Sequence, residues 1–246
     1  MPRTLKFGDV EVKPDVRRLS DMVEVVYDKD WLNTISNKEN IILYYMYRDI
    51  ALDDADREIM RKEHLRYDIT IIPPRKLGCE YVKTAGHLHP DVPGTNLSYT
   101  EIYEVLEGEA HYLLQKSEAG YVRDVVLVEA EKGDKVIIPP DYAHVTINPY
   151  QTELKMANWV SSRFSSIYEP IKERRGASYF ELVDDSFIRN ENYDDIPPLR
   201  RIKPSYIPNT EINKTEPMYP LIKKNPSALR FLNEPQNYRT LFKETP

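Results

Sequence analysis

Short apolar runs, separated by glycine, proline or asparagine, fill the centre of this chain and constrain its fold more than any other feature. β-branched and aromatic residues dominate them, as they do in strands. No long helical pattern interrupts them. Regularly spaced short strands of this kind predict an all-β barrel or sandwich. The runs up to Val160 are YLLQ, YVRDVVLVEA, DKVIIPP, HVTINP and LKMANWV.

The segments before these runs predict a mixture of strands and short helices. Acidic residues early and basic residues late in LDDADREIMRKEHL favour a helix, because the helix dipole prefers that order. The run NIILYYMY has the composition of a strand. We therefore expect an edge strand over Lys6–Lys13 and a helix that begins at Ser20 within Leu19–Asp28. We also expect strands over Asn40–Tyr47 and Arg66–Pro74, with a helix over Leu52–Leu65 between them.

The end of the chain has a different composition. No glycine follows Gly176, whereas nine of the nineteen prolines lie between Pro197 and Pro246. Proline removes a hydrogen-bond donor and fixes φ, so this region does not suit a regular core. We expect residues 186–246 to form an extended segment that packs on the barrel or on a partner subunit, with a disordered tail as the alternative. Residues 1–185 would form the folded domain, with its core at about 40–180.

Charge and composition exclude several classes of protein. The formal net charge of −6 argues against non-specific binding of nucleic acid. A single cysteine, Cys79, excludes an intramolecular disulfide and a cysteine-rich metal site, and it suits a reducing compartment. No stretch approaches the roughly 20 apolar residues of a membrane helix, and the first residues lack the apolar centre of a signal peptide. We therefore expect a soluble, cytoplasmic protein without membrane partners.

Imidazole and carboxylate groups concentrate in GHLHPDVPGTNLSYTEIYEVLEG. His87 and His89 are two residues apart, a spacing that places both side chains on one face of a strand. Glu101 could supply a third metal ligand from a neighbouring strand, and His144 a fourth if the proline-rich turn before it returns the chain. Such a histidine pair also arises by chance, and single histidines are more often structural. The other two histidines of the chain, His64 and His111, are the expected bystanders.

The spacing of these residues resembles the two motifs of the cupin superfamily. Gly108 follows Glu101 after six residues, and His144 lies five residues beyond Pro139 and four before Asn148. The chain departs from these motifs in three ways. No glycine lies six residues before His87, and Asp141 occupies the position of the motif glycine two residues after Pro139. Eleven residues separate His89 from Glu101, where the motif has three or four. The resemblance implies a double-stranded β-helix, or jelly-roll, barrel with N-terminal additions and a metal site of three histidines and one glutamate.

A narrower resemblance covers about residues 40 to 180. The segments YDIT, KTAGHLH, EIYEVLEG and PPDYAHVTIN are similar to those of the cupin-type, archaeal-class phosphoglucose isomerases. That family implies one divalent metal ion per subunit, Fe²⁺ first and Mn²⁺, Ni²⁺ or Zn²⁺ as alternatives, and a homodimer. The positions that match its metal ligands are His87, His89, Glu101 and His144.

The same resemblance implies a phosphate site at Thr70, Thr84 and Gly86. Hydroxyl groups and free backbone N–H groups can hold a phosphate, and a glycine permits close approach of the backbone. The alternative for Thr70 is an ordinary strand threonine. Lys83 would add charge, although strand alternation points it away from Thr84.

An aldose–ketose isomerisation moves a proton between adjacent carbons and needs an oxyanion to be held meanwhile. Glu101 is the carboxylate placed to move the proton, and Tyr103, two residues on, can donate a hydrogen bond. The resemblance adds Tyr168 as a catalytic residue. Val160 stands where the family often has a tyrosine, which puts one substrate contact in doubt. Tyr103 and Tyr168 could equally be structural, because the chain has 18 tyrosines.

The expected function is therefore a metal-dependent glucose-6-phosphate isomerase that forms fructose 6-phosphate through a cis-enediol, in glycolysis and gluconeogenesis. An isomerase of another sugar phosphate, such as mannose 6-phosphate, would use the same site. A non-haem metal dioxygenase would need an open coordination position but no phosphate cradle. A metal-stabilised sugar-binding module would not require a proton acceptor such as Glu101.

Overall fold

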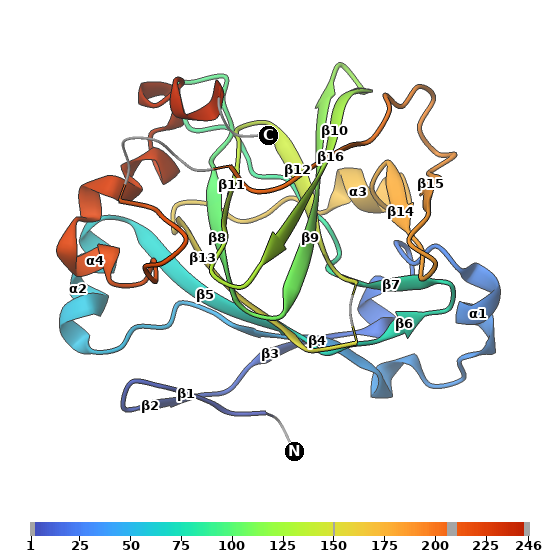
Figure 1. Cartoon of the computed structure of the whole chain (residues 1–246), viewed down its shortest axis with the longest axis horizontal. Coiled ribbons are helices and arrows are strands. Elements are labelled where there is room, and N and C mark those ends of the chain that lie inside the picture. Colours follow the sequence, from blue (N-terminus) through green and yellow to red (C-terminus); the bar gives the residue numbers. More distant parts are fainter. Residues whose placement is uncertain (1–2, 150, 206–210, 244–246) are drawn as a thin grey trace.

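The computed structural model describes residues 3–149, 151–205 and 211–243, and its core consists of two six-stranded sheets that face each other (Figure 1). One sheet has the order β16 (Arg200–Ile202), β10 (Tyr121–Glu131), β9 (Glu109–Glu118), β12 (Tyr142–Asn148), β7 (Glu80–Lys83) and β6 (Lys76–Leu77). The other has the order β11 (Lys135–Ile138), β8 (Glu101–Glu107), β13 (Leu154–Ser161), β5 (Leu65–Ile72), β4 (Ile42–Tyr47) and β3 (Asp15–Arg18).

Core strands alternate between the two sheets along the chain. β7, the β9–β10 hairpin and β12 belong to the first sheet, whereas β5, β8, β11 and β13 belong to the second. Neighbouring strands pair antiparallel, except that β16 adds to β10 in parallel. This alternation is the jelly-roll arrangement, so the predicted all-β jelly-roll fold class is confirmed.

The second sheet has an apolar outer face and an inner face on which polar pocket residues lie beside apolar core residues. Along β5, Arg66, Asp68 and Thr70 line the space between the sheets, and the residues between them pack in an apolar cluster on the opposite face. On β8, Glu101 and Tyr103 likewise face inward. The period of two in a strand produces this division, and it turns the polar side chains of β5 and β8 toward the first sheet.

The N-terminal predictions are partly wrong. The edge strand expected over Lys6–Lys13 is instead a hairpin of β1 (Leu5–Phe7) and β2 (Val10–Val12), because Gly8 adopts φ +61° and turns the chain. The helix expected within Leu19–Asp28 is only a 3₁₀ turn, η1 (Leu19–Met22). The valines that follow η1 are β-branched and disfavour a helix.

The helices are short and lie outside the barrel. The predicted helix over Leu52–Leu65 is confirmed as α2 (Asp54–Lys62), where the Asp53 side chain accepts a hydrogen bond from Asp56 N at 2.7 Å. Helix α1 (Lys29–Thr34), which has an Asp28 cap of the same kind, was not predicted from the sequence. None of the helices in the described residues is long and apolar enough to cross a membrane. The remaining helical elements are η2 (Lys38–Asn40), α3 (Glu169–Glu173), α4 (Leu221–Lys224), η3 (Pro226–Leu232), η4 (Pro235–Asn237) and η5 (Leu241–Lys243).

The proline-rich tail is not extended throughout, which corrects the expectation for residues 186–246. It begins with β15 (Phe187–Arg189), which pairs with β14 (Tyr179–Glu181), and later forms α4 and three 3₁₀ turns. Pro226 and Pro235 occupy the first turns of η3 and η4, where the fixed φ of proline favours a helical turn. Residues 206–210 and 244–246 lie outside the described residues.

The tail covers the outer face of the second sheet. Met218, Tyr219, Ile222 and Phe231 pack in the same apolar cluster as Trp159 of β13. In Figure 1 the tail helix α4 lies beside α2, at the margin of this sheet. The tail buries an apolar surface that includes Tyr67 of β5, Ile102 of β8 and Trp159 of β13.

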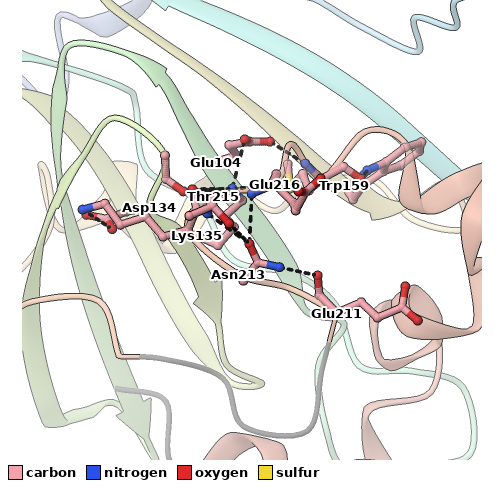
Figure 2. Close-up of polar contacts among 11 residues, drawn as sticks. Glu104, Asp134, Lys135, Trp159, Glu211, Asn213, Thr215 and Glu216 are labelled. Atoms are coloured by element: carbon pink, nitrogen blue, oxygen red, sulfur yellow. Dashed lines mark hydrogen bonds and ion pairs between the residues drawn. The ribbon is translucent and has the colours of Figure 1, made fainter.

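A buried ion pair fastens the tail to the sheet (Figure 2). Glu104 of β8 and Lys135 of β11 lie 3.1 Å apart, and both side chains are almost fully buried. Lys135 Nζ also donates to Glu216 O at 2.7 Å, and Glu104 Oε2 accepts from Met218 N at 2.9 Å. Trp159 Nε1 donates to Met218 O at 3.2 Å. The tail backbone therefore completes the hydrogen bonding of a pair of charges that the sheet buries.

Candidate metal centre

Four side chains from three parts of the barrel converge at the inner wall. His87 and His89 follow β7, Glu101 is the first residue of β8, and His144 lies in β12. His87 N donates to His144 O at 3.2 Å and His144 N donates to His87 O at 3.0 Å, an antiparallel bridge that brings the two segments together. One candidate ligand atom from each of the four residues lies within 4.8 Å of the others.

The donor set suits a divalent cation. His89 Nδ1 is 3.0 Å from Tyr99 O, so the ring donates its Nδ1 proton there and keeps a lone pair on Nε2. That Nε2 faces Glu101 Oε2 at 3.3 Å, and Oε2 is buried without a hydrogen-bond partner among the described residues. Two facing acceptors repel one another, and a cation between them would remove the repulsion. Zinc, for example, binds imidazole nitrogen and carboxylate oxygen at about 2.0–2.2 Å.

The electrostatics of the cluster favour the protonation states that a metal ion needs. Burial lowers the pKa of His87 far below its ordinary value, and His144 and His89 lower it further. Burial also lowers the pKa of His144, against the opposing effect of Glu101. For Glu101, burial opposes ionisation, but the interactions with His144 and His89 outweigh it and hold its pKa well below the usual range. Neutral imidazoles and an ionised carboxylate are metal-binding forms.

The two predicted catalytic tyrosines lie beside the cluster. Tyr103 Oη is 3.2 Å from His144 Nε2. Burial raises the pKa of Tyr103 well above its ordinary value and the charge of Glu101 raises it further, so the phenol stays protonated and can donate a hydrogen bond. Tyr168 immediately precedes α3, and its ring centroid lies 5.4 Å from that of His87.

A pocket opens beside the cluster between the two sheets. Thr70 and Thr84, the predicted phosphate-binding residues, both line it, whereas Gly86 does not. Gly86 adopts φ +78°, and a Cβ there would lie 2.7 Å from Val145 Cγ2, so close packing also demands glycine. Lys83 points elsewhere: it is ion-paired with buried Glu80, which agrees with the strand alternation.

The pocket also contains charged residues that the sequence analysis missed. Arg48, Arg66 and Asp68 line it together with Asn158. The signal was present in β5, where Arg66, Asp68 and Thr70 alternate with apolar residues and so must share one face.

The two expected bystander histidines lie outside the cluster. His111 Nδ1 is 2.7 Å from Glu181 Oε1, where it joins β9 to β14. His64 lies in the turn after α2, with φ +52°.

Comparison with known proteins places the chain in a family. The sequence profile described as "Glucose-6-phosphate isomerase (GPI)" matches residues 16–198. The glucose-6-phosphate isomerase of Pyrococcus furiosus is 32% identical over 136 residues, which cover 55% of this chain and 64% of that protein. That of Thermococcus litoralis is 31% identical over 136 residues, which cover 55% of this chain and 63% of that protein. The chain thus spans less than two thirds of the length of these relatives.

Among solved structures, one of an oxalate oxidase matches 52% of this chain and 56% of its own, with 18% sequence identity and a TM-score of 0.39. So distant a likeness says nothing about the reaction. The family profile, in contrast, covers most of the chain and includes every residue of the cluster and its pocket. The chain therefore belongs to the glucose-6-phosphate isomerase family.

Proposed function

We propose that this protein is a metal-dependent isomerase that interconverts glucose 6-phosphate and fructose 6-phosphate through a cis-enediol, in glycolysis and gluconeogenesis. The observation that carries the proposal is the cluster of His87, His89, Glu101 and His144, three of which line a pocket together with Thr70 and Thr84. Family membership and relatives with this name support it.

The four clustered residues would hold one divalent ion, with Fe²⁺ as the first candidate and Mn²⁺, Ni²⁺ or Zn²⁺ as alternatives. Imidazole and carboxylate ligands suit all four ions, so the donor set does not select among them. Such an ion supplies a Lewis acid that stabilises negative charge on a substrate oxygen.

Side chains and backbone of this chain would bind the phosphate, transfer the proton and hold the sugar. The hydroxyl groups of Thr70 and Thr84, which line the pocket, would bind the phosphate, whereas a phosphate contact at Gly86 stays a prediction from the family resemblance. Glu101 would take the proton from C2 of the open-chain aldose and return it to C1, while the hydroxyl proton on O2 passes to O1. Tyr103, protonated and 3.2 Å from His144, would donate a hydrogen bond to the sugar, and Tyr168 would close the pocket beside His87.

We further propose that residues 1–185 form the isomerase domain and that residues 186–246 serve as an extension that packs on the barrel or on a partner. The homodimer and the cytoplasmic location stay predictions from the sequence. Sedimentation at assay concentration tests the dimer, and a monomer would contradict it.

Replacement of Glu101 by glutamine tests the proposed reaction. The amide can still offer an oxygen to a metal ion but cannot accept a proton, so we expect most of the metal to be retained and kcat to fall roughly 10²–10⁴-fold. A coupled assay that detects glucose 6-phosphate formed from fructose 6-phosphate measures kcat, and elemental analysis measures bound metal. Glu107→Gln, the same change on an exposed residue of β8, should leave both unchanged.

Full turnover of Glu101→Gln at saturating metal would remove Glu101 as the base. An enediol also lets deuterium from D₂O enter the carbon that gains the proton, whereas a direct hydride shift does not. Oxygen uptake during turnover would identify a dioxygenase instead.

A further inference from the structure

A row of three residues crosses the inner wall of the pocket on adjacent strands. Val160 of β13 pairs with Arg66 of β5 on one side and with Glu101 of β8 on the other. Directly opposed residues of antiparallel strands project from the same face of a sheet. Arg66 therefore lies at the level of the metal cluster, with the short apolar side chain of Val160 between it and Glu101. All three line the pocket.

A buried carboxylate fixes the orientation of Arg66. Its Nε and Nη2 each lie 3.0 Å from Asp68 Oδ2. Asp68 is in turn held by Asp49 N, which donates to Oδ1 at 2.8 Å, and its side chain is only 6% exposed. Asp68 is thus anchored to the backbone on one side and to the guanidinium on the other. Rigid support of this kind organises a binding group before the ligand arrives.

Part of the Arg66 guanidinium is left to contact a ligand. Within the described ranges, the polar contacts of Arg66 are those to Asp68, so Nη1 carries two N–H groups with no protein acceptor. The side chain is 27% exposed and lines the pocket. Burial disfavours the charged guanidinium, but Asp68 and Glu101 raise the pKa of Arg66 above its ordinary value. Arg66 therefore carries a permanent positive charge.

The position of Arg66 along β5 shows which end of a substrate it can reach. Arg66 and Thr70 are four residues apart on the same strand, which separates their Cα atoms by about 13 Å. A phosphate at Thr70 and Thr84 would therefore lie at the far end of the pocket from Arg66. The sugar carbons next to Glu101 would lie at the near end.

We propose that Arg66 is a further substrate-binding residue, which contacts the C1–C2 oxygens of the sugar phosphate beside Glu101, and that Asp68 is its positioning residue. The inference rests on the proposed function. A guanidinium recognises planar, delocalised anions through paired N–H groups. An enediolate has this character at C1 and C2, as does the carboxylate of an aldonic acid. The pocket should therefore prefer ligands that carry charge at C1.

Two ligands that differ only at C1 test the proposal. 6-Phosphogluconate has a carboxylate there, and sorbitol 6-phosphate has a neutral alcohol. Calorimetry would measure the binding of each ligand to the metal-loaded wild-type protein and to the metal-loaded Arg66→Gln variant. We expect Arg66→Gln to weaken binding of 6-phosphogluconate roughly 10- to 100-fold, the range for a lost charge-assisted hydrogen bond. Binding of sorbitol 6-phosphate should change less than about twofold.

Two matched variants control for charge and for folding. Arg163→Gln removes an exposed arginine that does not line this pocket, and it should leave both affinities unchanged. Arg66→Gln alone leaves Asp68 buried without its partner, so the double variant Arg66→Gln/Asp68→Asn is measured alongside it and should show the same selective loss. The single variant Asp68→Asn should weaken the binding of 6-phosphogluconate more than that of sorbitol 6-phosphate. It removes the contact that orients the Arg66 guanidinium but leaves the charge of Arg66 in place.

The outcomes separate the inference from the proposed function. An equal loss for both ligands would place Arg66 at the phosphate, and no loss for either would make it structural. Each result overturns the inference and leaves the isomerase proposal intact. If neither ligand binds to the wild-type protein, the proposed function fails and the inference fails with it.

Discussion

Thr84 shows how one side chain can serve the fold and the pocket at once. Its Oγ1 accepts a hydrogen bond from Thr146 N at 2.9 Å, and its own N donates to Thr146 O at 2.8 Å. The hydroxyl proton is free to point elsewhere, because the oxygen uses a lone pair in this contact. Thr84 can therefore tie β7 to β12 and still donate to a phosphate.

Replacing Thr84 by alanine should raise KM for the sugar phosphate roughly tenfold or more and lower kcat much less, because a phosphate contact distant from the reacting carbons contributes mainly uniform binding. The change should also destabilise the fold by about 1–3 kcal/mol, since Thr146 N loses a buried partner. Steady-state kinetics and urea unfolding measure the two effects. Thr84→Ser keeps the hydroxyl and serves as the control. An unchanged KM with reduced stability would remove Thr84 from the phosphate site.

At the scale of residues, the match to two known motifs grouped His87, His89, Glu101 and His144, although His144 lies 43 positions beyond Glu101 (144 − 101). Arg66 escaped notice for a physical reason. Its neighbour in the row, Glu101, is 35 positions away (101 − 66) and meets it only through β13, which is still further along the chain. The local sequence pattern does not show how strands that are far apart in the chain align with one another in the sheet.

Among the elements, two ion pairs across β8 differ in burial but not in length. Glu104 and Lys135 are 3.1 Å apart and buried under the tail. Glu107 and Lys155 are 3.2 Å apart, with the glutamate side chain 59% exposed. Burial removes water from the first pair and leaves its charges dependent on each other and on the tail backbone. The two pairs therefore form a natural comparison.

Lys135→Met should destabilise the protein by about 3–5 kcal/mol, because it leaves Glu104 as an unpaired buried charge and deprives tail carbonyls of a donor. The double variant Glu104→Leu/Lys135→Met should lose less, since no charge remains buried. Urea unfolding monitored by Trp fluorescence measures both.

Lys155→Met breaks the pair with exposed Glu107 and should change the free energy of unfolding by no more than about 1 kcal/mol. A loss for Lys135→Met as small as that for Lys155→Met would contradict the role of the buried pair in fastening the tail.

Element type was predictable where the pattern is long and regular, as in β4, β5, the barrel strands and α2. The short elements were not: α1 spans six residues, and the helical turns of the tail arise where proline fits a first turn beside an apolar surface. The proline content of residues 186–246 alone suggested an extended conformation. The packing of Met218 and Phe231 on the sheet, which the composition cannot show, decides the shape of the tail.

On the scale of the whole molecule, the candidate metal centre joins the two sheets. His144 belongs to a strand of the first sheet, and Glu101 to a strand of the second. An ion held by both would cross-link the halves of the barrel. Because binding energy gained only in the folded state adds to stability, the metal should stabilise the whole fold as well as the pocket.

Removal of metal by a chelator should abolish isomerisation and lower Tm by roughly 5–10 °C, as expected when an ion at about 100 times its Kd is lost from a domain of this size. Fe²⁺, Mn²⁺, Ni²⁺ or Zn²⁺ should restore both. Calorimetry with elemental analysis of each sample is the measurement. His64→Ala, outside the cluster, should respond to chelation like the wild type. Undiminished activity in protein shown to contain no metal would refute the metal centre.

The tail that covers the second sheet also sets an order of events during synthesis. Residues 211–243 leave the ribosome only after β5, β8 and β13 have done so. Until then Phe7 already stacks on Tyr67, but Tyr67 and Trp159 lack their contacts with Tyr219 on the outer face. A nascent barrel with an exposed aromatic face is prone to associate with other chains. Translation speed near the end of the message, and chaperones that shield apolar surface, should therefore govern the yield of folded protein more than the closing of the barrel itself.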